Sequence, residues 1–61
     1  MIVYEDDVYR VIQDRINKHI IIFENGKFIY HASLDENSKM LNKDEAVQYL
    51  NAVKLLRKAK V

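Results

Sequence analysis

The chain has 61 residues, of which 49% are hydrophobic and 31% charged, and its formal net charge is +1. This balance is typical of a globular domain, and a charge near zero gives no overall attraction to nucleic acid or to a membrane surface. The sequence contains no cysteine, which excludes disulfide bridges and thiolate metal sites. We therefore expect a single domain over residues 1–61 that uses no cofactor and no metal.

The sequence lacks the features of a membrane or secreted protein. Its longest apolar run, Ile20–Phe23, is far too short to cross a bilayer, and Met1–Asp7 lacks the basic and long apolar regions of a signal peptide. We expect a cytoplasmic protein that does not bind membranes. Because a domain this short is only marginally stable without a disulfide, a metal or a partner subunit, we also expect it to form a homodimer.

The N-terminal third is predicted to hold a short strand and a helix. Met1–Tyr4 could form the strand. In Val8–Lys18, the apolar residues recur at spacings that place them on one broad helical face, and the acids at positions 5–7 would lie at the positive end of the helix dipole. Val, Ile and Tyr are mediocre helix formers, so a strand is the alternative. The pattern predicts a helix over Val8–Lys18.

The next segment contains a strong β-hairpin signal. Asn25-Gly26 joins two runs rich in β-branched and aromatic residues, and this dipeptide favours a type I′ turn because both central positions need a positive φ. A two-residue loop pairs Glu24 with Lys27 and Phe23 with Phe28.

Continued along the hairpin, this register pairs Ile20 with His31 and places His19 and His31 on opposite faces. A metal site shared by the two histidines is therefore not expected. Both faces of the hairpin are largely apolar, which is unusual in a short chain and indicates that each face is covered.

A second helix is predicted at the C-terminus, after a loop over Ser33–Leu41. Asn42 is a favourable N-cap, and Glu45 occupies the capping-box position three residues later. The helix should run to about Lys60, where its cations suit the negative end of the dipole. Its broad apolar face should cover the sheet and comprises Ala46, Val47, Tyr49, Leu50, Val53 and Leu56.

The same helix carries a second, narrower apolar stripe at i, i+3 and i+7 spacing: Ala52, Leu55 and Ala59. We predict that this stripe and a second sheet face, formed by Ile20, Ile22 and Ile29, make a subunit or partner interface. The alternative is a monomer in which two helices cover the two sheet faces and the stripe is simply exposed.

The end of the chain is basic. Lys54, Arg57, Lys58 and Lys60 lie close together with no acid among them, and they could contact phosphates in a nucleic acid. The competing interpretation is ordinary complementation of the helix dipole, because no helix-turn-helix pattern or basic–aromatic sheet face accompanies them.

No residue pattern predicts an enzyme. No carboxylates can be paired from the sequence, the serines have no partner at nucleophile spacing, and a single glycine excludes a phosphate-binding or dinucleotide loop.

We expect a small α+β domain in the order β-α-β-β-α, with a two- or three-stranded sheet. The leading hypothesis is a non-enzymatic homodimer that binds another macromolecule as an accessory, regulatory or inhibitor protein, and nucleic-acid binding is the alternative.

Overall fold

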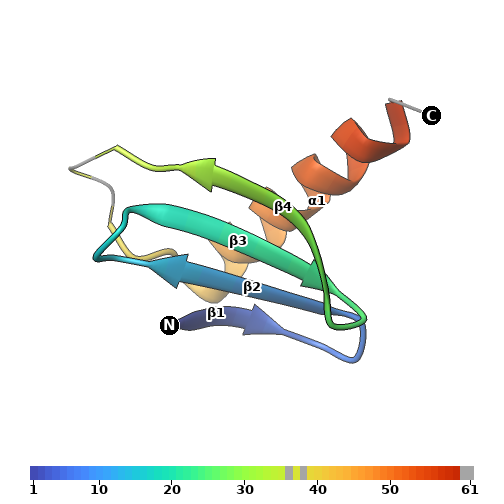
Figure 1. The fold of residues 1–61 in the computed structure, drawn as a ribbon, viewed down its shortest axis with the longest axis horizontal. Coiled ribbons are helices and arrows are strands. Elements are labelled where there is room, and N and C mark those ends of the chain that lie inside the picture. Colours follow the sequence, from blue (N-terminus) through green and yellow to red (C-terminus); the bar gives the residue numbers. More distant parts are fainter. Residues whose placement is uncertain (36, 38, 60–61) are drawn as a thin grey trace.

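The computed structural model describes residues 1–35, 37 and 39–59. A four-stranded antiparallel sheet is covered on one face by a C-terminal helix (Figure 1). The strands lie in the sheet in chain order, and the elements are β1 (Ile2–Glu5), β2 (Tyr9–Asp14), β3 (His19–Glu24), β4 (Lys27–Ser33) and α1 (Lys43–Ala59). The predicted α+β class is confirmed, but the order is β-β-β-β-α and the sheet has four strands.

The helix predicted over Val8–Lys18 is wrong, because this segment forms β2 and the turn that follows it. The acids before and within the segment build turns. The Asp6 Oδ1 atom accepts hydrogen bonds from the backbone N–H groups of Val8 and Tyr9, at 2.8 and 2.7 Å. Asp14 Oδ1 accepts one from Ile16 N at 3.0 Å. Short polar side chains that bond the nearby backbone favour turns over helices, so these acids end strands.

The hairpin between β3 and β4 is confirmed at its turn. Asn25 and Gly26 both have positive φ angles, of 51° and 79°, and Glu24 faces Lys27 while Phe23 faces Phe28. Beyond this point the predicted register is wrong, because β4 contains one extra residue, Ile29. Such a β-bulge moves every later side chain of the strand to the opposite face.

The core lies between the sheet and α1. The sheet contributes Val11, Ile20 and Ile22, each 0% exposed, and the helix contributes Ala46, Leu50 and Val53. Leu56, which was predicted to cover the sheet, is 53% exposed. The end of α1 extends past the sheet (Figure 1), so its last turns have little sheet beneath them.

Two polar contacts fix the segment before the helix. The predicted capping box is present: Glu45 N donates to Asn42 Oδ1 at 2.8 Å, and Asn42 N donates to Glu45 Oε1 at 3.0 Å. Gln13, only 3% exposed, donates to the Lys39 carbonyl at 3.1 Å and accepts from Leu41 N at 2.9 Å. These bonds satisfy a buried amide and hold the start of α1 against β2.

Candidate functional site

The face of the sheet opposite α1 consists of three rows of side chains that follow from the strand register. The central row crosses all four strands and contains Ile2, Ile12, Ile21 and His31. The row nearer the hairpin turn contains Glu5, Arg10, Phe23 and Phe28. The third row contains Asp14, His19 and Ser33. We call these three rows together the open face.

The open face carries exposed apolar side chains on its two edge strands. Phe28, on β4, is 60% exposed and Ile2, on β1, is 49% exposed, whereas Ile12 and Ile21 on the two central strands are half-buried. The rings of Phe23 and Phe28 meet edge to face with centroids 6.2 Å apart, and Arg10 and Glu5 of the same row form an exposed ion pair at 2.7 Å. Exposed apolar side chains beside charged ones suit a protein–protein contact.

The predicted interface residues fall into two groups. Ile20 and Ile22 lie in the core beneath α1, and Ile29 packs against that core, so the second sheet face predicted from them is the covered one. This placement corrects the prediction, because the only helix of the described chain covers this side of the sheet. The stripe of Ala52, Leu55 and Ala59 is exposed, with Leu55 at 68%, and its role in an interface remains a prediction.

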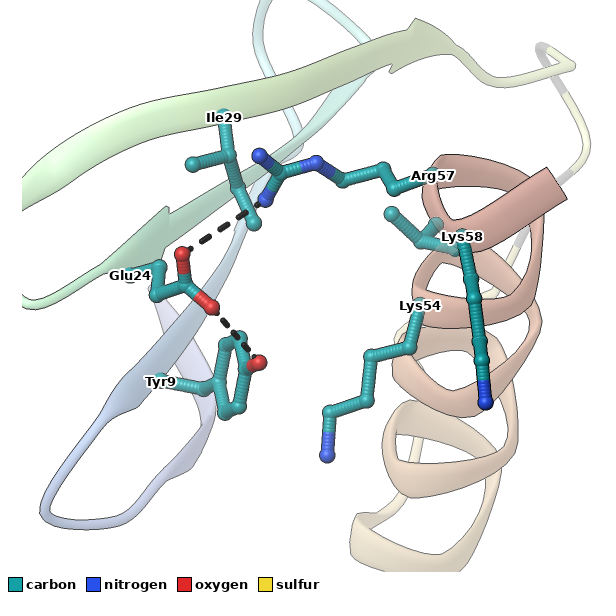
Figure 2. A pocket seen from close by; sticks show the side chains of 7 residues that line it. Tyr9, Glu24, Ile29, Lys54, Arg57 and Lys58 are labelled. Atoms are coloured by element: carbon teal, nitrogen blue, oxygen red, sulfur yellow. Dashed lines mark hydrogen bonds and ion pairs between the residues drawn. The ribbon is translucent and has the colours of Figure 1, made fainter. Parts of the chain in front are cut away.

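A cleft of about 280 Å³ opens between the turn end of the sheet and the last turns of α1 (Figure 2). Tyr9 and Glu24 line it from the sheet, and Lys54, Arg57 and Lys58 line it from the helix. The structure thus brings together three of the four residues predicted to contact nucleic acid. The fourth, Lys60, lies outside the described residues.

The charges inside this cleft are partly balanced. Tyr9 donates a hydrogen bond from its hydroxyl to Glu24 Oε2 at 2.7 Å, and this bond, followed by desolvation, raises the pKa of Tyr9. Arg57 Nη1 lies 3.7 Å from Glu24 Oε1, and Lys54 Nζ lies 4.4 Å from the centroid of the Tyr9 ring (Figure 2). Two of the three cations therefore already have a partner, which leaves a cleft that is only mildly basic.

The structure also brings together two residues that were predicted to lie apart. Because of the bulge at Ile29, His31 lies on the same face as His19, and their ring centroids are 5.0 Å apart. No local feature of the sequence signals a bulge at this position, so the pair could not be found from the sequence. Among the described residues, no group of three or more His, Asp or Glu side chains is placed to hold a metal ion.

No family model matches the chain, and neither a curated protein nor a solved structure matches it. In the part of the chain that the structure describes, no helix is long and apolar enough to cross a membrane. The function must therefore be inferred from the surfaces themselves.

Proposed function

We propose that this chain is a small, non-enzymatic interaction protein that forms a homodimer through the open face and binds another macromolecule in that form. The observation that carries the proposal is the exposed apolar surface of this face, where Phe28 is 60% and Ile2 49% exposed. The described chain has no second helix to cover them. Burial of apolar surface contributes roughly 25 cal/mol per Å², so a covering partner would stabilise this small domain.

A second copy suits the open face because the face carries both signs of charge. The acid Glu5 and the base Arg10 lie side by side in one row. In a two-fold dimer each copy presents the same patch to the other, so a face with both signs is able to meet itself without net repulsion. A strongly acidic or basic face would instead favour a partner of opposite charge.

The size of the open face predicts a weak dimer. Four strands about 4.8 Å apart, with about six residues rising about 3.4 Å each, give a face of roughly 400 Å² per copy. Stable interfaces bury about 800 Å² per partner, so this dimer should dissociate on dilution. Both sheet edges, the basic cleft and the helical stripe would remain available to another macromolecule.

The proposal is tested by the mass in solution, measured by sedimentation or light scattering across a dilution series. Phe28→Asp and Leu55→Asp form a matched pair, because the two side chains are 60% and 68% exposed in the single chain. We expect Phe28→Asp to be monomeric at concentrations where the unaltered chain and Leu55→Asp are dimeric. Circular dichroism would show whether each variant is folded, and Ile2→Asp gives a second substitution on the same face.

Two results would overturn the proposal. One is an unaltered chain that stays monomeric up to millimolar concentration. The other is the reverse pattern, in which Leu55→Asp dissociates the dimer and Phe28→Asp does not, since this would assign the contact to the helical stripe.

A second candidate function is nucleic-acid binding through Lys54, Arg57 and Lys58, which the fold gathers at one cleft. Phosphate contacts of this kind weaken steeply as salt is raised. We expect the chain to shift the electrophoretic mobility of a labelled oligonucleotide at low salt, and Lys58→Glu to lose this shift. An unaltered chain that gives no shift at low salt would exclude nucleic-acid binding.

No catalytic role is proposed. In the described part of the chain, the carboxylate in the basic cleft already accepts the Tyr9 hydroxyl and faces Arg57. Glu24 is therefore engaged on both oxygens and poorly placed to act as a general base.

A further inference from the structure

The two histidines of the chain lie next to each other on the open face. His19 faces Ser33 across the β3–β4 ladder, and His31 faces Ile21, so the histidines are diagonal neighbours on one side of the sheet. Their ring centroids are 5.0 Å apart and their planes are inclined at 77°. His31 is exposed and His19 is half-buried, so both rings are within reach of solvent.

This separation matches that of two imidazoles bound to one metal ion. A Zn–N bond of about 2.0–2.1 Å places each ring centroid about 3.2 Å from the ion, and a ligand angle between about 90° and 109° then separates the centroids by about 4.5–5.2 Å. The observed 5.0 Å falls in this range. Little rearrangement of the backbone is therefore needed to direct one nitrogen of each ring at a common ion.

The neighbouring groups favour a cation at this position. Asp14 faces His19 across the β2–β3 ladder, and its carboxylate is held in place by hydrogen bonds from Asn17 and from Ile16 N. On the other side, the Phe28 ring lies beside His31 with centroids 6.2 Å apart, which limits the positions of the imidazole. A fixed negative charge and a restricted ring both lower the free energy needed to form a two-point chelate.

We propose that His19 and His31 form a two-imidazole site for one divalent transition-metal ion of the Zn²⁺, Ni²⁺ or Cu²⁺ class. Imidazole nitrogens suit these borderline ions, whereas Mg²⁺ and Ca²⁺ prefer oxygen ligands. With two protein ligands the ion keeps water in its remaining positions. The site is formed by residues of a single chain and lies on the face that the proposed dimer would cover.

The test is a titration with Zn²⁺ alone, followed by calorimetry and by the NMR signals of the two imidazoles. We expect one ion per chain and simultaneous shifts of both rings. His31→Gln and His19→Gln should each weaken binding about tenfold or more, and the double variant should weaken it by less than the product of the two single effects, because either substitution alone already breaks the chelate. Mg²⁺ should leave both rings unchanged.

Two further variants separate a chelate from the mere presence of two histidines. His31→Gln combined with Gln48→His keeps two histidines but places the second on the exposed side of α1. This variant should bind as weakly as His31→Gln alone. His31→Gln combined with Ser33→His places an imidazole directly opposite His19, and binding should return.

The proposal is overturned if the single variants bind Zn²⁺ as tightly as the unaltered chain, or if the Gln48→His combination restores binding. Zn²⁺ that shifts neither ring at millimolar concentration would also overturn it. Repeating the titration on Ile2→Asp, which should be monomeric and changes a residue on β1 away from both histidines, keeps this result separate from that of the dimer proposal.

Discussion

The two faces of the sheet are built from alternating residues of the same strands, yet α1 covers only one of them. In β3, Ile20 and Ile22 are 0% exposed beneath α1, while Ile21 between them lies on the open face. A run of consecutive apolar residues is typical of a strand that is buried on both sides. β3 therefore has the residue pattern of a strand that is covered on both faces, whereas the described part of the chain covers only one of them.

The largest difference in stability between the two faces should appear when one isoleucine on each face is truncated. Ile22→Ala removes buried side-chain atoms from the core, and we expect it to lower the free energy of unfolding by about 2–5 kcal/mol. Ile21→Ala should lower it by about 1 kcal/mol or less when the chain is dilute and monomeric. Denaturant unfolding measures both values. Equal losses at high dilution would mean that the open face is as tightly packed as the covered one.

The two faces also differ in their buried polar contacts. The covered face contains the buried amide of Gln13, which holds the segment before α1 through Lys39 and Leu41. We expect Gln13→Met to reduce the free energy of unfolding by about 2 kcal/mol, because it leaves a backbone N–H and a backbone carbonyl unsatisfied. Gln48→Met, on the exposed side of the helix, is the control and should change little. The same denaturant measurement compares them, and equal stabilities would show that water replaces both bonds.

The turn at Asn25-Gly26 joins β3 to β4. A glycine is needed in this turn only because of the backbone conformation at that position. Gly26 has a φ of 79°, and a Cβ added there meets no atom within 4 Å. We expect Gly26→Ala to lower the free energy of unfolding by about 1–2 kcal/mol through strain in the left-handed region, without a steric clash. Thermal unfolding would detect this loss. An unchanged melting temperature would mean that the turn relaxes into another type.

The features that could be predicted from the sequence are those encoded by a few adjacent residues. The Asn25-Gly26 turn and the Asn42–Glu45 capping box each depend on local backbone geometry, and both appear as expected. The helix that begins at Lys43 follows from the same local signals.

Two features were not predictable because they depend on distant contacts. The apolar spacing of Tyr9–Asp14 fits a helical face as well as a strand, and pairing with β1 and β3 decides the outcome. The extra residue Ile29 in β4 has no local signature, yet it determines which face His31 occupies. The open face and the histidine pair could therefore not be predicted from the sequence, because both depend on the register of the strands.

The smallest expected effect is on how the free energy of unfolding changes at acid pH. It concerns Asp14, whose carboxylate accepts the hydrogen bonds of the turn before His19. Hydrogen bonds from the Asn17 side chain and then from its backbone lower the pKa of Asp14 below its usual value of 3.8. A carboxyl group whose pKa is lower in the folded state stabilises that state above the unfolded value, and this contribution is lost as the pH falls through the folded value.

Asp14→Asn keeps an oxygen that can accept the turn hydrogen bonds but cannot titrate. We expect the variant to be slightly less stable than the unaltered chain near neutral pH and to lose less stability between about pH 5 and pH 2. Denaturant unfolding over this range, with the chain dilute enough to be monomeric, measures the two slopes. Parallel slopes would show that the charge of Asp14 does not support the turn, and the fixed negative charge beside His19 would then lose its structural basis.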